Sequence, residues 1–185
     1  PVIYLLHGFG GDHTSWINRC GIDDLIDSLQ ADGGLMDCIY VLPNAWKSYY
    51  VNNYDSSVRY SDFFISELVP FIDSAYRTLD DKAGRALLGL SMGGYGGIML
   101  ALQHPDYFGT VVAFSAAVRT DEQFSALPQG RYEIFFSSVY GPGLNEMERI
   151  NCHWKMNSPF YLVDSANAAQ YKKINWYIDC GLSDP

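Results

Sequence analysis

The sequence has little positive charge and little charge altogether. Twelve Lys and Arg stand against 21 Asp and Glu, giving a net charge of -9 over 185 residues. Nucleic-acid binders present a basic face to phosphate, so this balance argues against them, and equally against docking on an anionic membrane. Only 18% of the residues are charged and 48% are apolar, which excludes an intrinsically disordered chain. No apolar run approaches the roughly 18 residues that a membrane span needs.

The cysteines lack the close spacing of a zinc site. The sequence contains Cys20, Cys38, Cys152 and Cys180, and no CxxC pair occurs. Zinc sites usually hold two such pairs or a pair with histidines, so we expect no metal, and no organic cofactor either. Two readings of the thiols stay open: four reduced cysteines, or one disulfide bond in a secreted enzyme.

The chain also lacks an initiator methionine and a signal peptide, and it begins and ends in apolar runs. Domains rarely begin and end on buried strands. We therefore expect residues 1–185 to be a single catalytic domain that is incomplete at both ends. A secreted or periplasmic bacterial protein is favoured over a cytoplasmic one.

Short apolar runs alternate with amphipathic stretches. The predicted strands are 2–6, 39–42, 86–90, 111–114 and 174–179, and the predicted helices are 23–29, 61–76 and 94–103. Strands that alternate with helices pair in parallel, so we expect a three-layer α/β/α sandwich with a mostly parallel sheet, covered on both faces. We expect a kink at Pro70. Residues 120–170 break the alternation, and we predict a cap-like excursion there.

The strongest motif is the pentapeptide GLSMG at 89–93, between a predicted strand and a predicted helix. This is the G-x-S-x-G nucleophile elbow in the context that it requires. Gly89 and Gly93 remove side chains that would collide in so tight a turn, and Ser91 is thereby presented above the sheet. The alternative is a chance pentapeptide in a glycine-rich turn.

A second glycine-rich loop, HGFGG at 7–11, follows the first predicted strand. Acyl transfer develops negative charge on a carbonyl oxygen, which two fixed N–H donors stabilise. We predict that the backbone N–H groups of Phe9 and Met92 form this oxyanion hole, with Gly10 as the fallback for Phe9. The alternative is an ordinary turn from a strand to a helix.

Four segments together resemble a known family. They are PVIYLLHGFGGDHTSW, LGLSMGGYGG, HPDYFGTVVAFSAA and INWYIDCG. Over nearly the whole chain they resemble the feruloyl esterase and esterase D branch of the α/β-hydrolase superfamily. The resemblance implies an α/β-hydrolase fold with Ser91 as nucleophile. In the Cys-Gly-x-x-Asp pattern of that branch, it also implies Asp184 as the acid of the catalytic triad, with Asp179 as its rival.

The histidine of such a triad follows the acid in the chain, but here the four histidines all precede Asp184. We expect His7 to brace the 7–11 loop, His13 to be solvated and His104 to cap the helix after the elbow. His153 is not favoured as the base. Because a serine without an imidazole is a weak nucleophile, we expect residues 1–185 alone to be inactive and the histidine to come from a missing C-terminal segment.

The loop 44–60 carries Trp46, Tyr49, Tyr50 and Tyr54 after the carboxyl end of a predicted strand, where open α/β sheets bind ligands. These rings are predicted to stack on a sugar or a hydroxycinnamoyl group; the alternative is that they pack the loop.

The expected function is therefore that of a serine carboxylic-ester hydrolase. The resemblance implies release of feruloyl or acetyl groups from plant cell-wall polysaccharide. The alternatives are a thioesterase of the S-formylglutathione hydrolase type, or a catalytically dead carbohydrate-binding domain. The expected partner is a small-molecule or polysaccharide ester, with no nucleic acid and no membrane, and the oligomeric state stays open.

Overall fold

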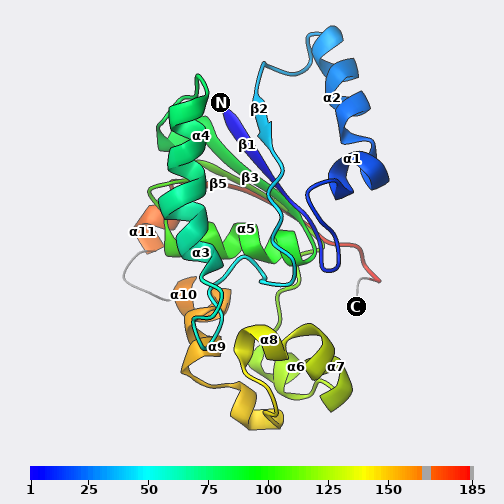
Figure 1. Ribbon diagram of the computed structural model, residues 1–185, viewed down its shortest axis with the longest axis vertical. Coiled ribbons are helices and arrows are strands. Elements are labelled where there is room, and N and C mark those ends of the chain that lie inside the picture. The colour runs from blue at the N-terminus through cyan, green and yellow to red at the C-terminus, as the bar shows by residue number, and fades with distance from the viewer. Residues whose placement is uncertain (164–167, 184–185) are drawn as a thin grey trace.

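A computed structural model describes residues 1–163 and 168–183 of the protein (Figure 1). The strands are β1 (Val2–Leu6), β2 (Ile39–Val41), β3 (Arg85–Leu90), β4 (Thr110–Phe114) and β5 (Asn175–Asp179). The helices are α1 (Ser15–Cys20), α2 (Ile22–Ala31), α3 (Tyr60–Phe63), α4 (Val69–Ala75), α5 (Met92–Gln103), α6 (Asp121–Ser125), α7 (Gln129–Phe135), α8 (Ser137–Tyr140), α9 (Cys152–Met156), α10 (Pro159–Val163) and α11 (Ala168–Tyr171). None of the helices in the described ranges has the length and apolar character that crossing a membrane requires.

The five strands form one parallel sheet in the order β2-β1-β3-β4-β5. All five predicted strands are confirmed, each to within one residue at either end, and so is the parallel α/β class. The chain passes from β1 outward to β2 and then returns to place β3 on the other side of β1. The strand order therefore reverses between β1 and β3, and the carboxyl ends of strands at such a reversal are where open α/β sheets bind ligands.

Helix α5 lies across the sheet and is buried on every side (Figure 1). Its Gly97 brings the helix against the sheet, where an added Cβ would contact Leu87 and Val111 at 3.6 and 3.7 Å. On another side Gly96 makes room for the Tyr50 ring, which would lie 2.4 Å from an added Cβ. Because α5 is apolar all round, it is packed between the sheet and the loops. That packing fixes its N-terminal end, which carries the elbow.

The face of the sheet that points away from α5 is less covered than the face packed against it. Along β3 and β4, residues that point toward α5, such as Leu87 and Val111, are fully buried, whereas the alternate residues Leu88 and Val112 are partly exposed. We expected strands buried on both faces because their sequences are continuous apolar runs. The described helices α3, α4 and α5 belong to the buried face. So does the turn Phe64–Leu68 that joins α3 to α4, where the ring centroids of Phe64 and Tyr4 lie 5.2 Å apart.

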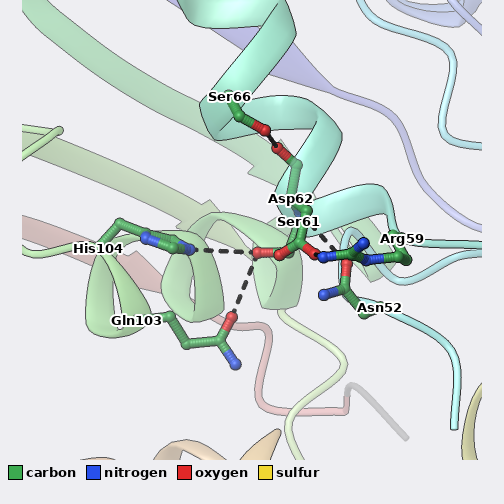
Figure 2. Close-up of polar contacts among 7 residues, drawn as sticks. All are labelled: Asn52, Arg59, Ser61, Asp62, Ser66, Gln103 and His104. Carbon is green, nitrogen blue, oxygen red and sulfur yellow. Dashed lines mark hydrogen bonds and ion pairs between the residues drawn. The ribbon is translucent and has the colours of Figure 1, made fainter. Parts of the chain in front are cut away.

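The predicted helix 61–76 is present, and its irregularity precedes Pro70 as a π-helical turn at Phe64–Leu68, between α3 and α4. Proline has no N–H to donate, and its ring crowds the carbonyl group four residues earlier, that of Ser66. A wider turn relieves that crowding. The Ser66 hydroxyl donates to the Asp62 carbonyl oxygen within this turn (Figure 2).

The described part of residues 120–170, here called the cap segment, folds into short helices, of which α6 to α10 lie together beyond one end of the sheet (Figure 1). Its centre is aromatic: Phe124 stacks on Trp154 with ring centroids 3.8 Å apart. Arg149 is 1% exposed and donates to backbone carbonyls, among them that of Leu127 at 2.7 Å. Residues of this segment reach the site described below, and its role as a cap over that site stays a prediction.

Candidate active site

Ser91 occupies the sharp turn between β3 and α5. Its φ of 56° and ψ of -114° lie in a region that residues other than glycine rarely adopt. The flanking glycines explain how the turn closes. A Cβ at Gly89 would lie 2.1 Å from the carbonyl oxygen of Gly93, and a Cβ at Gly93 would lie 2.1 Å from that of Leu6. The GLSMG segment thus has the strained strand-to-helix geometry of a nucleophile elbow.

Hydrogen bonds hold this strained turn in place. The N–H of Ser91 donates to the carbonyl oxygen of Phe114 at the end of β4, at 2.9 Å. The carbonyl oxygen of Ser91 accepts from the N–H groups of Tyr95 and Ala117, both at 3.0 Å. Helix α5 and the loop after β4 are therefore both attached to the backbone of residue 91.

The 7–11 loop lies beside Ser91, because Leu6 pairs with Gly89 in the sheet and both strands end together. A Cβ at Gly8 would lie 3.6 Å from the Ser91 Cβ. Among the hydrogen bonds of the described residues, none is donated by the N–H of Phe9 or of Met92. Both groups are thus free to donate to a substrate, and Met92 is the first residue of α5, where the helix dipole favours negative charge. That they form the oxyanion hole stays a prediction.

His7 holds this loop in place through buried hydrogen bonds. Its Nε2 accepts the N–H of Ala45 at 2.9 Å, so the proton of the neutral ring is on Nδ1, which lies 2.8 Å from the carbonyl oxygen of Gly8. The Tyr50 hydroxyl donates to the His7 carbonyl oxygen at 3.1 Å. The side chain is 1% exposed. This geometry agrees with the bracing role expected for His7.

Two cavities have Ser91 and Phe9 in their lining. One, of about 260 Å³, lies between the 7–11 loop and α1 and is lined by apolar groups such as Trp16 and Leu90. The other, of about 370 Å³, extends toward the cap segment and includes Tyr49 and Phe136. Ser91 is thus accessible from two cavities.

The family model described as "Putative esterase" matches residues 1–185. The chain belongs to this esterase family. A solved ferulic acid esterase is 33% identical and superposes with a TM-score of 0.73, over 98% of this chain and 66% of that one. A solved S-formylglutathione hydrolase from Staphylococcus aureus, 24% identical, has the same fold, with a TM-score of 0.72 over 98% of this chain and 64% of that one.

Curated relatives agree with this assignment. An endo-1,4-beta-xylanase/feruloyl esterase of Xylanibacter ruminicola is 36% identical over 113 residues, which is 59% of this chain and 15% of that protein. An esterase of Mycobacterium tuberculosis is 28% identical over 197 residues, which is all of this chain and 40% of that protein. The chain therefore spans less than half the length of these relatives. The expected family and the α/β-hydrolase fold are confirmed.

The other histidines are His13, His104 and His153. His13 is exposed, and His104 caps the far end of α5, a helix of 12 residues, roughly 18 Å from Ser91. Figure 2 shows the His104 Nε2 atom directed at the Ser61 hydroxyl, 3.4 Å away. Burial lowers the pKa of His104 and of His153. Within residues 1–163 and 168–183, no histidine nitrogen lies within hydrogen-bonding distance of the Ser91 hydroxyl.

The two candidate acids differ in how far the structure describes them. Asp184 lies outside the described residues, so its role stays a prediction. Asp179, the rival, ends β5 and is exposed; its carbonyl oxygen accepts the N–H of Ser115 at 2.8 Å. Asp179 lines a neighbouring apolar cavity rather than either of the two that contain Ser91. No group of three His, Cys, Asp or Glu that could hold a metal ion occurs among the described residues.

The four aromatic residues predicted to bind substrate have different positions. Tyr49 lines the larger cavity at Ser91. Tyr50 is fully buried beneath the 7–11 loop, so the structure places it in the core rather than at the substrate. Trp46 is 65% exposed and lines a separate small cavity, while the exposed Tyr54 lies near Gly141, and neither reaches the cavities at Ser91. For Tyr50 the structure supports the alternative reading, in which the ring packs the loop. Substrate binding by the exposed Trp46 and Tyr54 stays a prediction.

The sequence analysis missed other residues of the larger cavity, namely Phe135, Phe136, Arg119 and Arg131. Arg119 had a detectable signal, because it follows the predicted strand 111–114, whose carboxyl end lies beside that of the elbow strand. The two phenylalanines and Arg131 come from the cap segment, and no local pattern relates that segment to Ser91.

Replacing His7 by phenylalanine tests the bracing role. The ring of phenylalanine fills similar space but leaves the buried N–H of Ala45 without its acceptor. We expect a loss of about 1–3 kcal/mol in the free energy of unfolding, measured by urea denaturation. The matched control is His13→Phe in the same loop, where the exposed side chain makes no such contact. Equal midpoints for the two variants would contradict the brace.

Proposed function

We propose that the protein is a serine carboxylic-ester hydrolase. The observation that carries the proposal is the position of Ser91: it is on a strained elbow at the reversal point of the sheet, between two cavities and beside two N–H groups that have no acceptor among the described residues. Belonging to an esterase family supports the same chemistry.

In the proposed mechanism the Ser91 hydroxyl attacks the ester carbonyl carbon and its proton passes to a general base. The carbonyl oxygen becomes an oxyanion held by the N–H groups of Phe9 and Met92. The proton is then given to the departing alcohol, and water releases the acid from the acyl-enzyme in a second cycle of the same steps. The base is an imidazole oriented by a carboxylate, for which Asp184 is the candidate. None of the four histidines in the sequence is placed to act as that base.

For the substrate we propose a feruloyl or acetyl ester of plant cell-wall polysaccharide, which implies a secreted or periplasmic enzyme. Relatives named feruloyl esterase and acetyl esterase support this class. So do the rings of Tyr49, Phe135 and Phe136 along the larger cavity, because an aromatic acid can pack against them. A thioester of the S-formylglutathione type is the second candidate, supported by a solved neighbour of that name.

Labelling of the whole protein with a fluorophosphonate tests the mechanism. We expect covalent modification at Ser91, read by peptide mass spectrometry, and none in Ser91→Ala. A folded protein that does not react would favour the catalytically dead carbohydrate-binding domain. Rates on methyl ferulate and on S-formylglutathione then separate the two substrate classes, and a clear preference for the thioester would overturn the polysaccharide proposal.

A further inference from the structure

The larger cavity at Ser91 carries positive charge in a protein whose net charge is -9. Arg119 and Arg131 both line it, together with the amide side chain of Gln123. Arg119 follows β4, whereas Arg131 and Gln123 belong to α7 and α6 of the cap segment. Two separate parts of the chain thus bring guanidinium groups to the space beside the nucleophile.

Arg119 is held in a defined position relative to Ser91. The N–H of Ala117, two residues earlier, donates to the carbonyl oxygen of Ser91 at 3.0 Å. The Arg119 guanidinium carbon lies 5.9 Å from the centre of the Phe136 ring. Its charge also opposes the rise that burial causes in the pKa of Tyr49, another residue of the same cavity. The guanidinium is therefore fixed between a backbone attachment to the elbow and two aromatic side chains.

No carboxylate of the described residues neutralises this group. The ion pairs within residues 1–163 and 168–183 join Arg59 to Asp62 and Arg85 to Asp73. The Nε of Arg119 is buried and has no hydrogen-bond acceptor among the described residues.

The carboxylates of the cap segment that lie close in sequence have other partners. Glu122 is hydrogen-bonded to the Thr120 side chain and to its own backbone N–H. Asp121 accepts from the indole N–H of Trp154 at 2.8 Å. Glu133 accepts from Gln129 at 2.8 Å and from the N–H of Gly143 at 3.0 Å. Among the described residues, a partly buried guanidinium without a counter-charge thus lines the cavity beside Ser91.

We propose that Arg119, with Arg131 at the rim, binds a carboxylate group carried by the ester substrate, so that the enzyme prefers anionic esters over neutral ones. The inference rests on the proposed esterase function. Because feruloyl and acetyl groups carry no carboxylate, it either places an acidic group on the alcohol part of such an ester or replaces the proposed acid by one that carries a second carboxylate. A guanidinium offers parallel N–H donors that match the two oxygens of a carboxylate, and these charge-assisted bonds are stronger than those to a neutral hydroxyl. The carboxylate can belong to the acid or to the alcohol of the ester, since each flanks the carbonyl carbon at Ser91.

Two pairs of small esters, assayed on the whole protein, show whether the carboxylate belongs to the acid or to the alcohol of the ester. For the acid side the pair is mono-p-nitrophenyl succinate and its methyl ester; for the alcohol side it is 4-acetoxybenzoate and its methyl ester. The pair that responds identifies the side of the ester that carries the carboxylate. In that pair we expect Arg119→Gln to lower kcat/KM for the anionic ester roughly 10- to 100-fold, mainly by raising KM. We expect its neutral counterpart to change less than about threefold, since a neutral group makes no charge-assisted bond. Arg119→Lys keeps the charge and should recover part of the loss.

The matched control is Arg77→Gln, which removes the same charge from an exposed position on another part of the chain. It should leave both esters of each pair unchanged. Equal losses on anionic and neutral esters in Arg119→Gln, or no loss on either, would overturn the inference while the esterase function stands. Failure of the esterase function would instead appear in the unmodified protein, as absence of labelling at Ser91. In that event the carboxylate site is tested without catalysis, by calorimetric titration with succinate and with 4-hydroxybenzoate. Binding that is lost in Arg119→Gln supports the carboxylate site. Absence of binding to the unmodified protein, or binding that Arg119→Gln leaves unchanged, refutes it.

Discussion

Replacement of Ser91 by alanine is expected to lower kcat on p-nitrophenyl acetate by roughly 10⁴- to 10⁶-fold in the whole protein, because the nucleophile of a catalytic triad acts as a unit with its base. The fold should be unaffected, since no hydrogen bond of the Ser91 hydroxyl supports the described structure. Residual hydrolysis above the rate in water would come from the two oxyanion donors alone. Circular dichroism and the urea midpoint check that the variant is folded.

Ser61→Ala is the matched control for this experiment. Ser61 has a histidine beside it, with the His104 Nε2 atom 3.4 Å from its hydroxyl, and so resembles the first two members of a triad (Figure 2). It is only 4% exposed and lies at the far end of α5 from the elbow. We expect its loss to leave kcat unchanged. Full activity in Ser91→Ala, or a collapse of activity in Ser61→Ala, would show that the nucleophile has been assigned to the wrong serine.

The strands and the class of the fold could be predicted because each strand is a short apolar run bounded by polar, glycine or proline residues. Helix α1 (Ser15–Cys20) was missed, since six residues are too few to show a helical period. Residues 120–170 could be recognised only as irregular. Their packing depends on contacts between distant positions, such as the stack of Phe124 on Trp154, which no local pattern encodes.

For the site, the sequence predicted correctly those positions that are determined by the pairing of strands in the sheet. The elbow and the 7–11 loop follow two strands that are neighbours in the sheet, so any parallel arrangement that pairs those strands brings Ser91 and Gly8 together. The sequence did not predict which side chains line the cavity and which are buried in the core, because side-chain packing determines this. Tyr49 and Tyr50 are adjacent and chemically identical, yet one lines the cavity and the other is in the core. Both have positive φ, 53° and 61°, and this unusual backbone could not be foreseen from tyrosine residues.

Gly93→Ala is expected to destabilise the protein by at least about 3 kcal/mol, or to prevent folding. The new Cβ would lie 2.1 Å from the carbonyl oxygen of Leu6 and 2.9 Å from that of His7. Both atoms belong to the backbone where β1 passes into the 7–11 loop, so neither can move aside as a flexible side chain would. Relief of the clash requires β1 and α5 to separate at the point that holds Ser91.

The matched control is Gly130→Ala. Gly130 lies in the first turn of α7 with nothing within 4 Å of an added Cβ, and its φ is negative. Alanine there should be neutral or stabilise by up to about 1 kcal/mol, because it favours the helix and restricts the unfolded chain. Urea denaturation of the two variants measures the contrast. If Gly93→Ala folds with the stability of Gly130→Ala, the close contact between β1 and the elbow is not present, and the oxyanion donors cannot be placed beside Ser91 as described. If it folds but is merely less stable, the separation of the two loops should also lower kcat, because Phe9 and Met92 would no longer be aligned on one oxygen.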